Sequence, residues 1–144
     1  MYRATIGIAA APEQVYAWLT DPQRIRSWQP DVIEFQSPEG GLRVGARARA
    51  LTQEYGRRFD VEFVVVAVTV NEHVAWDMNA PTVSARIEYR LLHDGSGTRV
   101  ECTMAPRFKG LTRWLSPLLK NLIQRKIESR LALLRKRVEA GHGS

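Results

Sequence analysis

The sequence predicts an α+β domain in which an antiparallel sheet of six to seven strands wraps around one long C-terminal helix, with two short helices after the first strand. Three observations lead to this prediction. Segments with alternating apolar residues, typical of strands, follow one another from residue 32 to residue 104. The breaks between them are too short for crossover helices, so neighbouring strands run antiparallel. After Pro106 the apolar spacing becomes helical and stays so to the end of the chain.

The first strand is predicted at residues 2–8, because Ala4, Ile6 and Ile8 alternate onto one face. A helix then starts at Pro12, since proline suits a first helical position and apolar residues follow at helical spacing. A second helix starts with Asp21 as N-cap and Pro22 at the first position. Pro30 disfavours a helical conformation for the residue before it, so this helix ends at about residue 28, a tryptophan.

Six further strands are predicted at residues 32–36, 45–53, 58–70, 73–79, 82–92 and 98–104. Alternation assigns one apolar face to each of the last four, and that face must point to the helix. On residues 58–70 the inward set is Phe59, Val61, Phe63, Val65 and Ala67. On the next three strands the inward sets are Val74, Trp76 and Met78; Val83, Ala85, Ile87, Tyr89 and Leu91; and Val100, Cys102 and Met104.

The strand at residues 45–53 has an unusual inward face. Its inward residues are Ala46, Ala48 and Ala50, because Arg47 and Arg49 belong on the solvent side. Alanines fill little space under a sheet, so either large neighbours cover them or the space stays open to a ligand.

The C-terminal segment contains Ser116-Pro117. Proline inside a helix costs about 3 kcal/mol. We therefore predict a short turn at residues 111–115 and a long helix that begins with Ser116 as N-cap and ends at about Glu139. Its apolar stripe, which is expected to cover the sheet, consists of Leu118, Leu119, Leu122, Ile123, Ile127, Leu131, Leu134 and Val138.

Composition limits the function classes. Met1 leads directly into a strand, and no apolar run approaches about 18 residues, so neither a signal peptide nor a membrane span is expected. The single cysteine, Cys102, excludes an internal disulfide and a multi-cysteine zinc site, and the expected location is cytoplasmic. The basic residues behind the net charge of +6 are concentrated after residue 106. They are expected to form a solvated helix face or, alternatively, a contact for an anionic membrane surface. No nucleic-acid-binding motif is present.

Three stretches carry a resemblance to a known family. They are residues 11–32, APEQVYAWLTDPQRIRSWQPDV; the Val44-Gly45-Ala46 start of the third strand; and residues 116–139, SPLLKNLIQRKIESRLALLRKRVE. Together they bracket nearly the whole chain, which resembles the helix-grip fold of the START/Bet v 1-like superfamily (SRPBCC) and, within it, the polyketide cyclase/dehydrase and lipid-transport family. The resemblance implies one ligand-binding domain at residues 1–140 with a short tail at 141–144. It also implies a cavity for apolar ligands between sheet and helix, without a cofactor.

The inward sets and the resemblance together predict which residues line the cavity. Trp28 and Trp114 are expected either as walls of its mouth or as packed core residues. The complete set is Trp28, Ala46, Ala48, Ala50, Phe63, Val65, Trp76, Met78, Ala85, Ile87, Tyr89, Cys102, Met104, Trp114, Leu115, Leu118, Leu119 and Leu122.

Three functions remain open at this stage. The first is binding or transport of a hydrophobic small molecule, by a monomer or a homodimer. The second is a metal-free polyketide cyclase or dehydratase that positions its substrate, with Tyr89 as the candidate acid because it is the one inward group able to donate a proton strongly. The third is an interaction module that uses the basic C-terminal helix. The histidines show no metal-ligand spacing, so no metal site is predicted.

Overall fold

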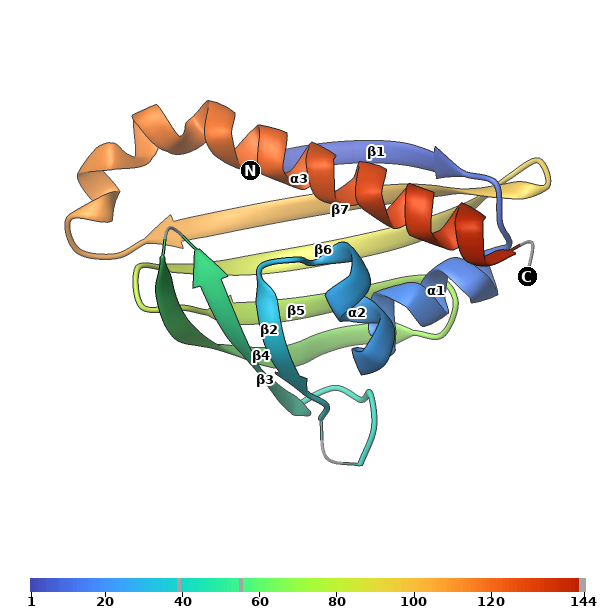
Figure 1. Ribbon diagram of the computed structural model, residues 1–144, viewed down its shortest axis with the longest axis horizontal. Helices are drawn as coiled ribbons and strands as arrows, with labels where there is room; N and C mark the ends of the chain where they lie inside the picture. The colour runs from blue at the N-terminus through green and yellow to red at the C-terminus, as the bar shows by residue number, and fades with distance from the viewer. Residues whose placement is uncertain (39, 55, 143–144) are drawn as a thin grey trace.

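The computed structural model describes residues 1–38, 40–54 and 56–142. Seven antiparallel strands form one sheet in the order β1-β7-β6-β5-β4-β3-β2, and three helices lie on its concave inner face (Figure 1). The elements are β1 (Tyr2–Ile8), α1 (Pro12–Thr20), α2 (Pro22–Trp28), β2 (Val32–Gln36), β3 (Arg47–Glu54), β4 (Arg57–Thr69), β5 (His73–Asn79), β6 (Val83–Asp94), β7 (Gly97–Phe108) and α3 (Thr112–His142). The predicted α+β architecture and helix-grip fold are therefore confirmed.

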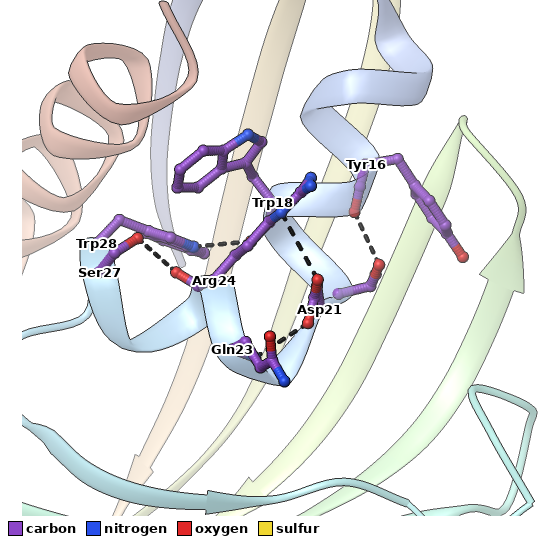
Figure 2. Close-up of polar contacts among 8 residues, drawn as sticks. Tyr16, Trp18, Asp21, Gln23, Arg24, Ser27 and Trp28 are labelled. Carbon is purple, nitrogen blue, oxygen red and sulfur yellow. Dashed lines mark hydrogen bonds and ion pairs between the residues drawn. The ribbon is translucent and has the colours of Figure 1, made fainter. Parts of the chain in front are cut away.

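The α1–α2 corner forms as the two prolines predict (Figure 2). The side chain of Asp21 accepts a hydrogen bond from the backbone N–H of Gln23, at 3.0 Å, and so caps α2. Trp28, at the end of α2, donates from Nε1 to the carbonyl oxygen of Trp18 on α1, at 2.9 Å. The guanidinium of Arg24 lies 5.3 Å from the centre of the Trp18 ring. These contacts join the two short helices into one unit.

Strand β4 departs from strict alternation. A bulge between Val65 and Ala67 shifts its register against β5, so that Val68 rather than Ala67 lies opposite the inward Val74. Ala67 pairs instead with Ala75, which points to the outer face. The prediction that Ala67 faces inward was wrong, because alternation counts residues and cannot show where one extra residue is inserted.

Strand β7 continues to Phe108, past the point where the sequence predicts helical spacing. Pro106 lies within it, opposite Ala85 on β6. The pairing of β1 with β7 ends at Tyr2, opposite Met104. Beyond Met104 one side of β7 is therefore a sheet edge, where a residue without an N–H is tolerated.

Helix α3 begins four residues before the predicted start and contains Pro117 as an interior residue. The N-cap role predicted for Ser116 was wrong. Proline at 117 cannot donate to the carbonyl of Arg113, and the Ser116 hydroxyl donates to that oxygen instead, at 3.1 Å. The helix also continues through the first two residues of the predicted 141–144 tail, and the last two residues lie outside the described residues.

Two contacts fix the position of α3 along β1. The side-chain amide of Gln124 donates to the carbonyl of Arg3, at 2.9 Å, and a carboxylate oxygen of Glu139 accepts from the backbone N–H of Ala9, at 2.9 Å. The helix therefore lies beside β1, as Figure 1 shows. Residues of α3 before Gln124 extend past the first residue of β1.

Candidate functional site

The inner face of the sheet carries two hydrophobic clusters. The larger lies under the C-terminal half of α3 and contains Ala4, Ile8, Ala10, Val15, Leu19, Trp28, Leu91, Val100, Cys102, Ile127, Leu131, Leu134 and Val138. The smaller lies on β4, β5 and the residue just before β3, and contains Ala46, Val65, Val74 and Trp76. Tyr89 packs against both clusters.

The alanine row on β3 has a clear steric role. Phe35 on β2 and Phe63 on β4 flank β3, and their ring centres lie 6.3 Å apart. Phe35 pairs with Ala50, and Phe63 pairs with Ala48. Because β3 lies between the two strands, the rings meet above it only if its inward side chains are small. The alanines are inward and buried as predicted, and large neighbours cover them.

The aromatic side chains continue across the sheet from this point. The Phe63 ring meets the edge of Trp76 with centres 6.1 Å apart, and Trp28 meets Tyr89 in the same geometry at 6.1 Å. Such edge-to-face pairs each stabilise by about 0.5–1.5 kcal/mol beyond burial of their area. The inner face therefore carries a chain of aromatic rings from β2 to β5, and a separate aromatic pair joins α2 to β6.

Part of the inner face remains uncovered. Phe63, Met78, Ile87, Tyr89 and Met104 point inward but are only half-buried. They are neighbours across the sheet: Met78 lies opposite Phe63, and Ile87 lies opposite Met104. By contrast, inward residues under the C-terminal half of α3, such as Val100, are fully buried. We call these five half-buried residues the open apolar surface.

The N-terminal half of α3 passes this end of the sheet. Thr112, its first residue, donates through its hydroxyl to the carbonyl of Thr82, just before β6, at 2.9 Å. Further along, Lys126 forms ion pairs with Asp31, at 3.2 Å, and with Glu54 at the end of β3. The segment from Thr112 to Lys126 is thus held at both ends.

The predicted lining residues of α3 divide into two groups. One helix face carries Leu115, Leu119, Leu122 and Lys126, which follow one another at steps of four, three and four residues. This face points to the β2–β3 side. Leu119 is half-buried, whereas Leu115 and Leu122 are nearly half exposed. Leu118 and Trp114 lie on an outer face and are 79% and 78% exposed. Leu118 and Leu122 therefore do not cover the sheet as the predicted stripe required, because no strand lies close enough beneath them.

The structure separates the two tryptophans expected at a common mouth. Trp28 is 2% exposed and belongs to the larger cluster, with its one polar group satisfied by Trp18 (Figure 2). Trp114 is on the exposed first turn of α3. Of the two roles left open for Trp28, the structure shows that of a packed core residue.

Two titratable groups, Tyr89 and Cys102, lie side by side on the inner face, and both are neutral at physiological pH. Tyr89 lies opposite Cys102, and its hydroxyl donates a hydrogen bond to the thiol. Burial raises the pKa of Cys102 to about 12, although the hydrogen bond from Tyr89 acts in the opposite direction. Burial, followed by the neighbouring Cys102, raises the pKa of Tyr89 well above its usual value, and the charge of Arg130 lowers it by less. Neither group is suited to accept a proton near pH 7.

Sequence reasoning missed one charged cluster beside the site. Arg130 and Lys126 on α3 both pair with Asp31, which lies between α2 and β2. Burial lowers the pKa of Lys126, while Asp31 raises it. The i, i+4 spacing of the two basic residues was visible in the sequence, but their partner lies far away in the chain. Only the fold brings the cluster together.

The structure also has a depression that the sequence did not predict. It measures about 450 Å³, lies where α3 crosses β1, and is lined by Arg3, Ala4, Thr5, Ile6, Glu128 and Leu131. It is open to solvent, and charged side chains make up part of its wall. It does not overlap the predicted lining residues. For an apolar ligand the open apolar surface is the better candidate, because its residues are aromatic or aliphatic and face the fold's interior.

Comparison with known proteins agrees with the fold. The family model for polyketide cyclase/dehydrase and lipid transport matches residues 2–139. Similar structures include TTHA0849 from Thermus thermophilus, at 23% identity over 97% of both chains with a TM-score of 0.78. A START superfamily protein from Mycobacterium smegmatis is 16% identical over 96% of both chains, with a TM-score of 0.80.

The Zhui aromatase/cyclase from Streptomyces sp. R1128 is 18% identical, with a TM-score of 0.79 over 95% of this chain and 92% of that one. No functionally curated protein is detectably similar in sequence. In the part of the chain that the structure describes, no helix has the length and hydropathy needed to cross a membrane. The match over nearly the whole chain leads to one assignment: the chain belongs to the polyketide cyclase/dehydrase and lipid transport family.

Proposed function

We propose that this protein binds a hydrophobic small molecule between the open apolar surface and the N-terminal half of α3. One observation carries the proposal. Phe63, Met78, Ile87, Tyr89 and Met104 face the interior of the fold yet keep accessible surface, while inward residues under the C-terminal half of α3, such as Val100 and Cys102, are buried. Apolar surface left uncovered inside a fold gains free energy when a ligand removes it from water, about 25 cal/mol per Å².

The composition of the surface indicates a ligand with flat, apolar parts. The rings of Phe35, Phe63 and Trp76 form a chain of contacts at 6.3 and 6.1 Å, and a planar ligand can extend that chain. The family description, which joins polyketides and lipids, supports the same ligand class.

A filling substitution tests the proposal. Met78→Trp adds a large ring to the open apolar surface, where Met78 is half-buried and has room on one side. We expect binding of an apolar fluorescent probe to weaken by about 10-fold or more, with the melting temperature within a few degrees of the parent. Val64→Trp is the matched control, because Val64 lies on the neighbouring strand but points to the outer face. Equal probe binding by the parent and Met78→Trp would contradict the proposed site.

A second candidate function is cyclisation or dehydration of a polyketide-like substrate held in this site. The observation that favours it is the position of Tyr89, whose half-buried side chain brings a hydroxyl to the otherwise apolar site, where it can turn from Cys102 and donate its hydrogen bond to a substrate carbonyl. The same solved fold is used by the Zhui aromatase/cyclase.

Tyr89→Phe separates the two functions. For binding alone, loss of one hydrogen bond is expected to cost about 0.5–1.5 kcal/mol of affinity. For catalysis assisted by Tyr89, turnover of a candidate substrate is expected to fall by about 100-fold or more with little change in probe affinity. Unchanged turnover in Tyr89→Phe would exclude a catalytic role for this hydroxyl.

A further inference from the structure

The N-terminal part of α3 and the residue just before it carry an exposed apolar patch that does not pack into the core. Five residues form it, and we call them the α3 patch: Leu111, Trp114, Leu115, Leu118 and Leu122, which are 83%, 78%, 48%, 79% and 46% exposed. Their spacing of three or four residues places them along one side of the helix start. A stretch of about eleven helical residues is about 16 Å long, so the patch is an extended stripe.

The α3 patch is separate from the buried face of the same helix. Ile127, Leu131, Leu134 and Val138 supply the apolar contacts of α3 with the core. Other exposed apolar side chains, such as Val44 and Val70, lie in loops and do not join the patch. Five large apolar side chains gathered on one exposed element are typical of an interaction surface rather than of ordinary surface composition.

The charges around the patch are of one sign. Between residues 107 and 127 the sequence has six basic residues and no acidic one: Arg107, Lys109, Arg113, Lys120, Arg125 and Lys126. Lys126 is paired with Asp31 and Glu54. Arg107, Arg113, Lys120 and Arg125 are exposed and form no ion pair with any carboxylate of the described residues. A partner for this surface must therefore accept both apolar side chains and unpaired positive charge.

We propose that the α3 patch docks onto an anionic membrane surface. A helix with apolar residues on one side and flanking basic residues lies in the plane of a bilayer interface, with its apolar side chains below the headgroups. Trp114 at the helix start suits that depth, because an indole has an apolar body and one polar N–H. A second copy of this chain fits less well, because it brings the same positive charges to the interface. A convex single helix also offers little of the shape complementarity that a protein partner needs.

Docking gives the proposed ligand site a position relative to the lipid. Leu115 and Leu122 belong to the α3 patch and also lie on the helix face that turns toward the β2–β3 side. A membrane that covers the patch therefore lies beside the open apolar surface, and an apolar ligand can pass between them without crossing water. This last step rests on the proposed function, whereas the docking itself does not.

Vesicle sedimentation tests the docking. Phosphatidylcholine vesicles are compared with vesicles that also contain phosphatidylglycerol, at low and high salt. We expect the parent protein to sediment with the anionic vesicles and much less with the neutral ones. Leu118→Asp is expected to lower the partition by about 10-fold or more. Val70→Asp is the matched control, because Val70 is a similarly exposed apolar residue on the β4–β5 turn, and it should partition as the parent does.

A second variant tests the role of charge. Arg113→Gln combined with Lys120→Gln should weaken binding to anionic vesicles and reduce its dependence on salt.

The proposal is overturned if the parent does not sediment with anionic vesicles, or if Leu118→Asp and Val70→Asp sediment equally. It is also overturned if the parent is a dimer in gel filtration and Leu118→Asp is a monomer, because a second copy then covers the patch. Probe binding in the absence of vesicles reports on the ligand site separately.

Discussion

The two halves of α3 have the same kind of sequence but different surroundings. Apolar residues recur every three or four positions in both. In the second half, Ile127, Leu131, Leu134 and Val138 are all buried against β1 and the short helices. In the first half, Leu118 and Leu122 remain exposed. Core packing therefore accounts for only half of the helix. The first half is held by polar contacts at its ends, and its apolar residues are left available for a ligand or a surface.

The largest expected effect is in the buried half. Leu134→Asp places a charge at a position with 0% exposure, in the middle of the larger cluster. We expect the free energy of unfolding to fall by about 4 kcal/mol or more, which is enough to unfold many domains of this size. Urea denaturation followed by circular dichroism measures it. A variant as stable as the parent would show that α3 does not pack on the sheet.

A smaller effect is expected at the junction of the two halves. Asp31→Asn removes the carboxylate shared by Lys126 and Arg130. Because the three side chains are partly exposed, we expect a loss of about 1–3 kcal/mol, below that of a fully buried pair. Asp21→Asn is the matched control, because asparagine also caps a helix and the ion pair of Asp21 with Arg24 is long, at 3.6 Å, and exposed. Equal losses of stability in Asp31→Asn and Asp21→Asn would show that the ion pairs of Asp31 contribute no more than an exposed surface pair.

The same junction has a pH signature. Burial lowers the pKa of Lys126 in the folded protein, while Asp31 raises it. Between the lowered folded value and the ordinary value of 10.5, the unfolded state binds more protons, so this group makes stability rise with pH. Without Asp31 the folded pKa falls further. The stability difference between parent and Asp31→Asn is therefore expected to shrink as the pH rises toward 10.5, and a difference independent of pH would contradict this coupling.

The smallest effect is expected in the exposed half. Leu118 is 79% exposed, so Leu118→Asp should change the free energy of unfolding by no more than about 0.5 kcal/mol. Leu118→Asp and Leu134→Asp are measured by the same urea titration. The difference between their losses of stability compares the two halves of α3 directly. A large loss in Leu118→Asp would mean that the first half of α3 packs against protein in solution.

Local signals in the sequence predicted most of the fold. Proline and aspartate set the starts of α1 and α2, and alternation found every strand, because these signals depend on residues close together in the chain. The errors arose where a contact with another part of the structure overrides a local sequence rule. Pro106 is tolerated in β7 because β1 ends beside it, and Ser116 compensates for Pro117 inside α3. The bulge in β4 depends on its pairing with β5.

The candidate site was harder to predict. Periodicity shows which side of a helix is apolar, but it cannot show whether another element lies against that side. For this reason Leu118 and Trp114 were assigned to a cavity and prove to be exposed. The alanine row was assigned correctly to the inner face, yet its role depends on Phe35 and Phe63 from two other strands. Asp31, Lys126 and Arg130 form a cluster only in three dimensions.

The chain's single thiol is in the centre of the buried region. Cys102 is 3% exposed and accepts a hydrogen bond from Tyr89, and its pKa is raised to about 12. Since the thiolate is the reactive form, a rise from the ordinary value of 9.0 lowers its population near neutral pH by about 1000-fold. Oxidants and alkylating reagents therefore reach Cys102 chiefly in molecules whose sheet has separated from α1 and α3. The rate at which Cys102 is modified therefore measures how often the core opens, and the measurement needs no mutation.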